Sequence, residues 1–229
     1  MSLASILLSK NPSYSPPAAC FLKLQTRMDT PLISATKEFV KQFMSQHDSS
    51  HDYQHVERVL TLSQKILAAS QISVSPTVVT LLALLHDVGD KKYTSGSGNP
   101  RPVESFLLSA GAEPELAVLV QELADNVSYS HELANRDSVA AMVEQHPELA
   151  IVQDADRLDA IGAVGVARTF TYTAAKGKSG GMGEAIRHFD EKLLLLEGGM
   201  KTAEGKELAK VKGERIKAFR EWWRDEVGE

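Results

Sequence analysis

The sequence contains a single cysteine, Cys20, among its 229 residues. One cysteine excludes an internal disulfide and any zinc site built on several thiolates, and it is typical of a protein from a reducing compartment. No stretch approaches the roughly 18 consecutive apolar residues that a membrane-spanning helix needs. We therefore expect a cytoplasmic protein that has no membrane partner.

A basic excess is missing as well. The 25 Lys and Arg residues face 30 Asp and Glu residues, so the formal net charge is -5. A surface for nucleic-acid polymers normally carries an excess of positive charge, and we expect no such partner. Convincing strand-like alternation and internal repeats are also absent. Because the remaining periodicity is helical, we predict an all-α helical bundle without a substantial sheet.

Residues 1–28 differ in composition from the rest, with several serines, three basic residues and no acidic residue. Such a composition resembles an organelle transit peptide, but Pro16 and Pro17 interrupt the amphipathic helix that a transit peptide forms. We predict a flexible N-terminal extension over residues 1–28, with organelle targeting as the alternative. Residues 29–229 are predicted to form one domain that includes the C-terminal helices.

Apolar spacing predicts a series of helices, which cover residues 31–46, 53–69, 76–86, 101–111, 114–126, 137–145, 184–196 and 206–226. Segment 148–175 is rich in alanine and glycine, and this predicts a closely packed, central buried helix. Trp222 and Trp223 are predicted to anchor the last helix to the core.

Histidine and aspartate residues occur at three helical places that together make a metal-ligand set. His55 lies on the apolar face of its helix, and His86-Asp87 directly follows a long apolar run. An ionised aspartate at the edge of a buried helix is costly unless a partner or a metal neutralises it. A further aspartate comes from Asp154 or Asp156. Such a set suits one Mn, Fe, Co, Ni, Mg or Zn ion with positions left for water and substrate, and we favour Mn.

The motifs around these residues resemble the HD superfamily of metal-dependent phosphohydrolases, and in particular the bacterial YedJ/YpgQ-like branch. The resemblance extends over about residues 35–222. It rests on the order and spacing of short motifs, namely Ser50-His51-Asp52, His55-Val56-Glu57-Arg58-Val59, Ala83-Leu84-Leu85-His86-Asp87-Val88-Gly89-Asp90, Gln153 to Ala163, Ala167-Arg168-Thr169-Phe170 and His188 to Leu193. It implies a helical HD fold.

The resemblance also implies roles for individual residues. His55, His86 and Asp87 take the places of the first three metal ligands. Asp156 is preferred over Asp154 as the last ligand, because it precedes a basic and an apolar residue as in the general HD pattern. Asp154 is then a supporting or structural carboxylate.

Catalytic roles fall on Asp90, His86 and Asp87. Asp90 follows Asp87 by three residues, where some HD nucleotidases carry a glutamate proposed to handle the proton. We therefore predict that Asp90 is the general base or orients the attacking water.

Further polar residues are candidates for substrate binding, namely His51, Arg58, Lys91, Lys92, Asn126, His188 and Lys192. His51 and Arg58 flank His55 at helical spacing, which fits either a phosphate contact or a surface salt bridge. Lys91 and Lys92 fit a phosphate contact or a solvated pair at a helix end. Arg168 is expected to pair with a nearby aspartate rather than with substrate.

For the YpgQ-like branch, the resemblance implies hydrolysis of nucleoside triphosphates to monophosphate and pyrophosphate. The expected substrate is a phosphorylated small molecule, in particular a nucleotide. An exposed C-terminal helix offers a surface for a homodimer. Two alternatives stay open: an HD enzyme that acts on another phosphoester or hydrates a nitrile-like molecule, and a nucleotide-binding module without catalysis. The base, the sugar, the native metal and the cleaved bond are not fixed by the sequence.

Overall fold

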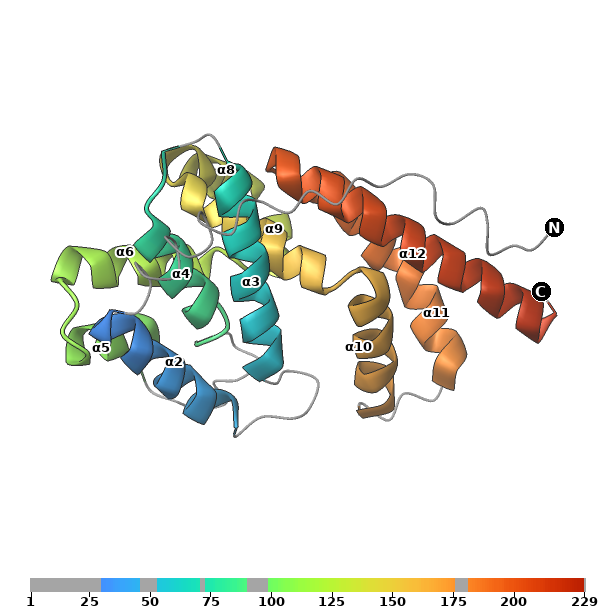
Figure 1. The fold of residues 1–229 in the computed structure, drawn as a ribbon, viewed down its shortest axis with the longest axis horizontal. Coiled ribbons are helices and arrows are strands. Elements are labelled where there is room, and N and C mark those ends of the chain that lie inside the picture. Colours follow the sequence, from blue (N-terminus) through green and yellow to red (C-terminus); the bar gives the residue numbers. More distant parts are fainter. Residues whose placement is uncertain (1–29, 46–52, 71–72, 90–98, 176–180, 229) are drawn as a thin grey trace.

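The computed structural model describes residues 30–45, 53–70, 73–89, 99–175 and 181–228, and every regular element among them is a helix (Figure 1). The prediction of an all-α fold is therefore confirmed. The predicted N-terminal extension lies outside the described residues. Within the described part of the chain, none of the helices is both long enough and apolar enough to cross a membrane.

Three helices, α3 (Tyr53–Ala69), α4 (Pro76–Leu85) and α9 (Pro147–Asp159), pack against one another at the centre of the fold (Figure 1). All residues of α4 from Val78 to Leu85 are buried, which is why its sequence is apolar on every side. Ser75 caps the first turn of α4 by accepting a hydrogen bond from the Val78 N–H.

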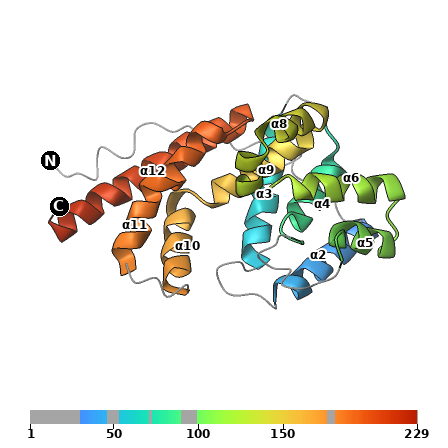
Figure 2. The same cartoon turned by 180° about the vertical axis from the view of Figure 1, so that it is seen from behind.

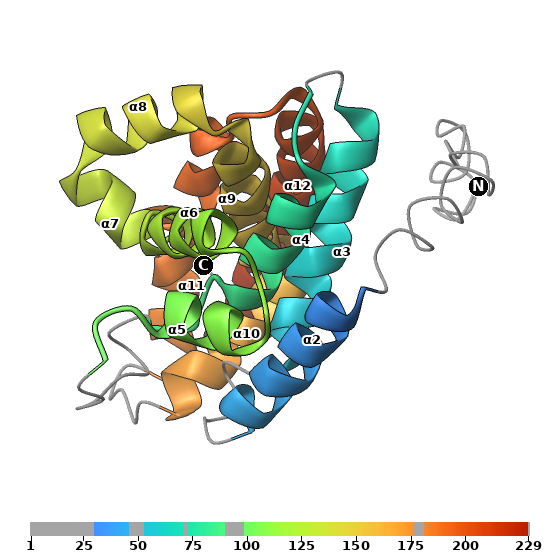
Figure 3. The same ribbon diagram turned by 90° about the vertical axis from the view of Figure 1, so that its left-hand side faces the viewer.

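The helices α2 (Pro31–Met44) and α6 (Pro114–Asp125) pack against the buried α4, and α5 (Pro102–Ser109) packs against α6. Two shorter helices, α7 (Tyr129–Ala134) and α8 (Arg136–Gln145), then lead into α9. Figure 3 shows α7 and α8 on the side of the bundle that lies away from α2 and α3. Helix α7 was not among the helices expected from the sequence, since none of its residues is buried.

The C-terminal part consists of α10 (Gly162–Ala175), α11 (Gly181–Glu191), the 3₁₀ helix η2 (Leu193–Gly199) and the long α12 (Ala203–Val227). These elements gather on one side of the central helices, as both faces of the molecule show (Figures 1 and 2). Their shared core includes the aromatic rings of Phe170, Phe189, Phe219 and Trp223.

Three expectations about this region are wrong. The predicted helix 184–196 is α11 followed by the separate 3₁₀ helix η2. Segment 148–175 is two helices rather than one, because Gly162, the first residue of α10, takes a left-handed φ of 76°. Only one tryptophan anchors the last helix. Trp223 lies against Phe170, whereas Trp222 is 65% exposed.

Candidate metal centre and substrate pocket

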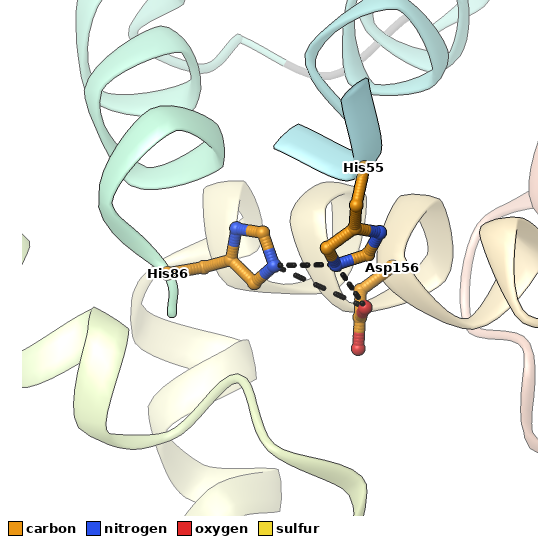
Figure 4. A group of neighbouring side chains, drawn as sticks. All are labelled: His55, His86 and Asp156. Atoms are coloured by element: carbon orange, nitrogen blue, oxygen red, sulfur yellow. Dashed lines mark hydrogen bonds and ion pairs between the residues drawn. The ribbon is translucent and has the colours of Figure 1, made fainter. Parts of the chain in front are cut away.

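Four side chains predicted as metal ligands converge from the three central helices. His55 lies in the first turn of α3, His86 caps the end of α4 with Asp87 directly after it, and Asp156 lies near the end of α9. Figure 4 shows the side chains of three of them pointing toward one another. Residues that are far apart in the sequence thus meet because α3, α4 and α9 form one packed unit.

The distances between the donor atoms fit a shared cation. His55 Nε2 lies 3.3 Å from His86 Nε2, and 3.5 Å from both Asp87 Oδ2 and Asp156 Oδ1. His86 Nε2 lies 3.5 Å from Asp87 Oδ2 and 3.9 Å from Asp156 Oδ1. Bonds of about 2.1 Å to one ion separate neighbouring ligands by roughly 3.0 to 3.5 Å. Donor atoms of His55, His86 and Asp156 all lie within 4.8 Å of one another, and Asp87 adjoins both imidazoles, so the cluster is close to the spacing of a divalent metal site.

Both imidazole rings are held with Nε2 directed into the cluster. His55 Nδ1 lies 2.8 Å from Asp159 Oδ2, and His86 Nδ1 lies 2.9 Å from the Ala83 carbonyl oxygen. These acceptors require an N–H at Nδ1, which leaves Nε2 of each neutral ring with a lone pair. Two facing lone pairs repel unless a proton or a cation lies between them. The chemistry of the donor set thus fits a divalent metal ion.

Asp159 contacts His55 at Nδ1, the ring nitrogen that points away from the cluster. Its carboxylate, which is 2% exposed, also accepts hydrogen bonds from Arg58 and Arg168. Burial alone would raise the pKa of Asp159, but the bonds from His55 and Arg58 outweigh burial and hold it well below its usual range. Asp159 therefore stays ionised and fixes the orientation of the His55 ring.

The same network changes the pKa of His55. Burial disfavours the charged ring and lowers its pKa, whereas hydrogen bonds to Asp159 and Asp87 raise it, and the balance is a pKa of about 9. At neutral pH the metal-free protein therefore holds a proton on this ring, at the place where a metal ion would bind.

Asp154 and Asp156, two residues apart on α9, point to different places. Asp156 belongs to the cluster, whereas Asp154 is fully buried and accepts hydrogen bonds from the Lys201 N–H and from the N–H and hydroxyl of Thr202. Asp154 thereby holds the start of α12 against α9. This geometry agrees with the preference for Asp156 as a ligand and with a structural role for Asp154.

A pocket of about 330 Å³ opens onto the four donors. This volume lies within the range of small-molecule sites, about 300 to 1,000 Å³. Its other polar lining residues are Ser128, Tyr129, Ser130, Arg157, Arg168 and Lys192. Positive side chains thus line the same pocket as the two carboxylates of the cluster.

The candidates for substrate binding divide into three groups. Lys192 lines the pocket. Arg58, Asn126 and His188 do not belong to the lining: Arg58 pairs with Asp159, and Asn126 donates to the Glu122 carbonyl oxygen.

The remaining candidates, His51, Lys91 and Lys92, lie outside the described residues, as does the predicted catalytic residue Asp90.

Several lining residues were not among the predicted site residues. Arg157 directly follows the predicted ligand Asp156 in the sequence. Arg168 pairs with Asp159, as expected, and also lines the pocket. Tyr129 and its neighbours come from the short α7 and the residue before it. The sequence signal for Arg157 was its place directly after a predicted ligand, where a buried charge is unusual.

Comparison with known proteins places this geometry in a family. The HD domain model matches residues 52–161, a segment that contains all four donors. The protein YpgQ of Bacillus subtilis is 35% identical over 161 residues, which cover 69% of this chain and 75% of YpgQ. These matches agree with the resemblance that the sequence motifs predict.

Solved structures extend the likeness to most of the chain. A crystal structure of Bacillus subtilis YpgQ in complex with ADP has a TM-score of 0.65 at 26% identity and covers 86% of this chain and 97% of that chain. An HD-superfamily hydrolase from Bacillus thuringiensis has a TM-score of 0.64 at 27% identity, with coverages of 91% and 98%. With its helical fold and its clustered histidines and aspartates, the chain belongs to the HD superfamily, in the YpgQ-like branch.

Proposed function

We propose that the protein is a metal-dependent phosphohydrolase that converts nucleoside triphosphates to nucleoside monophosphates and pyrophosphate. The observation that carries the proposal is the meeting of two imidazole nitrogens and two carboxylates in a pocket that Arg157, Arg168 and Lys192 also line. Cation ligands and anion-binding groups in one pocket suit a metal-bound chain of phosphates. The complex of the relative YpgQ with ADP supports a nucleotide as the ligand.

In this proposal His55, His86, Asp87 and Asp156 hold one divalent ion, with Mn²⁺ favoured. Such an ion activates water and stabilises negative charge on a phosphoryl oxygen. The chain's own contribution is orientation: Asp159 and the Ala83 carbonyl oxygen each accept the Nδ1–H of one ligand ring. Both rings are thereby oriented with Nε2 toward the ion, and His55 gives up its Nε2 proton when the ion binds.

The reaction requires that a water oxygen form a bond to the α-phosphorus. The bond from that phosphorus to the oxygen bridging to the β-phosphorus breaks, and pyrophosphate leaves with this oxygen. Asp90 remains our proposed acceptor for the proton of the water, on the basis of its position three residues after Asp87. Arg168 and Lys192 line the pocket and supply positive charge near the phosphates.

The experiment is a product analysis with a matched pair of variants. Purified protein with Mn²⁺ is incubated with ribo- and deoxyribonucleoside triphosphates, and the products are separated by anion exchange. Asp87→Ala removes a proposed ligand, whereas Asp190→Ala removes an exposed carboxylate that pairs with Arg220 on the surface.

We expect monophosphate and pyrophosphate from the wild type and from Asp190→Ala, and a loss of at least about a thousandfold in Asp87→Ala. Turnover that survives in Asp87→Ala without metal would contradict the proposal. Release of inorganic phosphate instead of pyrophosphate would assign a different bond to the enzyme.

A further inference from the structure

Arg157 is among the largest side chains that are almost fully buried, yet it lines the pocket. Its Nη2 donates to Glu132 of α7. Its Nε and Nη1 atoms are buried and have no hydrogen-bond partner among the described residues. A buried guanidinium group with N–H groups that lack acceptors is costly, and natural proteins rarely keep one without a reason.

The other two arginines near the cluster are engaged differently. Arg58 and Arg168 both direct guanidinium nitrogens at Asp159, where they help to hold His55. Asp159 is thus the acceptor for both, and neither is as deeply buried as Arg157, since their side chains are 32% and 25% exposed. Arg157 is therefore the arginine that lines the pocket and carries buried donors with no acceptor among the described residues.

The groups around Arg157 leave positive charge in excess on this wall. Glu132 is shared between Arg157 and Lys201, whose Nζ lies 2.7 Å from Glu132 Oε1. The guanidinium carbon of Arg157 and the ammonium nitrogen of Lys192 lie 5.6 Å and 6.0 Å from the centre of the Tyr129 ring. Glu132 is thus shared by two cations, which favours an anionic ligand beside Arg157.

The position of Arg157 on α9 indicates how many anionic groups a ligand needs to reach both Arg157 and the four-donor cluster. It directly follows Asp156, so a cation ligand and an anion donor come from consecutive residues that both line the pocket. A ligand that reaches both needs one oxyanion at the four-donor cluster and a second one beside the guanidinium group. An arginine N–H without an acceptor on the chain can donate a charge-assisted hydrogen bond to a phosphoryl oxygen.

We infer that Arg157 binds the phosphoryl group next to the one held at the four-donor cluster, so that the pocket selects ligands with at least two linked phosphoryl groups over monophosphates. The inference rests on the proposed function for the phosphate nature of the ligand. It adds the residue that discriminates by phosphate number, and it accounts for the unpartnered donors.

ADP and AMP test this selection because they differ by one phosphoryl group. Their affinities are measured by isothermal titration calorimetry in one Mn²⁺-containing buffer, for the wild type, Arg157→Gln, Arg157→Lys and Arg187→Gln. Arg187 is a matched control, since its side chain is 62% exposed and pairs with Glu184 on the surface. Mn²⁺ affinity is measured for each variant to show that the four-donor cluster is intact.

We expect the wild type and Arg187→Gln to bind ADP at least about tenfold more tightly than AMP. Arg157→Gln should lose about 10- to 100-fold in ADP affinity while AMP and Mn²⁺ affinities change by less than about threefold. Arg157→Lys keeps the charge but not the Nε and Nη1 donors and should lose about tenfold. If Arg157→Gln does not fold, the Arg157→Lys protein still tests whether Arg157 selects ADP over AMP.

Glu132→Gln separates binding from a structural role. Removing this negative charge should tighten ADP binding by a few-fold, because Glu132 then no longer competes with the anion for the guanidinium group. A purely structural Arg157–Glu132 pair predicts no such gain.

An unchanged preference for ADP in a folded Arg157→Gln or Arg157→Lys protein would overturn the inference, as would equal binding of ADP and AMP by the wild type. Triphosphate turnover is measured separately. Arg157-dependent selection of ADP without turnover would contradict the proposed function alone, and turnover with Arg157-independent selection would contradict the inference alone.

Discussion

Asp159 offers a sharp test of how the site is held together, because it contacts His55 without belonging to the four-donor cluster. Its carboxylate accepts from His55 Nδ1 at 2.8 Å, from Arg58 Nε at 2.6 Å and from Arg168 Nη1 at 2.6 Å. Asp159→Asn keeps the shape but removes the charge, and its amide N–H groups would face other donors. Loss of such a supporting carboxylate lowers metal affinity by about 10- to 100-fold, or about 1.4 to 2.7 kcal/mol.

Stability should fall in the same variant. Removing one partner of a buried ion pair costs about 3 to 5 kcal/mol, and we expect the lower end because water reaches the Arg58 and Arg168 side chains, which are 32% and 25% exposed. For a chain of this size about 3 kcal/mol lowers Tm by roughly 6 to 12 °C.

The assay is calorimetric titration of Mn²⁺ into metal-free protein at pH 8.5, with differential scanning fluorimetry of the same samples. The high pH matters because Asp159 also raises the pKa of His55, so its loss would ease competition from the proton at lower pH. Asp190→Asn, an exposed carboxylate on the surface, is the control. An affinity for Mn²⁺ within twofold of the wild type in Asp159→Asn would refute the reasoning.

Three further outcomes follow from the same network. The pKa of His55 is raised to about 9, so Mn²⁺ must displace a proton from this ring. The apparent affinity for Mn²⁺ should therefore rise by roughly tenfold per pH unit from pH 6.5 to 8.5. A calorimetric affinity that does not change with pH would contradict this. Asp154→Asn weakens the contacts to Lys201 and Thr202, so chemical denaturation should show a free energy of unfolding lower by about 1 to 3 kcal/mol. Mn²⁺ affinity should stay within twofold of the wild type, and a large loss of Mn²⁺ affinity would indicate that Asp154 is a ligand. Gly205→Ala should lower Tm, because a Cβ there would overlap Asp154; an unchanged Tm would show that the start of α12 moves easily.

The four converging side chains could be predicted from the sequence because each stands in a recognisable setting. The uniformly apolar run before His86 predicted a helix buried on all sides, and this helix delivers His86 and Asp87 to the centre of the fold. His55 shared the apolar face of its helix, and it is 2% exposed. The choice between Asp154 and Asp156 needed the family pattern, since composition alone treats two neighbouring aspartates alike.

Other features of the fold and of the site depend on tertiary contacts, which a local sequence pattern does not predict. Helix α7 has no buried residue and therefore no apolar periodicity, yet it supplies Tyr129 to the pocket and Glu132 to Arg157. The end of α9 depends on the left-handed backbone of Gly162, which in the sequence is one small residue among many. The pairing of Arg58 with Asp159 joins residues 101 positions apart, so its position beside His55 suggested a phosphate contact equally well.

The most direct test of the central claim is an anomalous difference map from crystals of the protein grown with Mn²⁺. We predict one peak per chain, about 2.0 to 2.3 Å from His55 Nε2, His86 Nε2 and a carboxylate oxygen of Asp87 and of Asp156. A protein without a peak at this place, or with its peak at Asp154, would contradict the assignment of the metal centre and the hydrolase proposed on it.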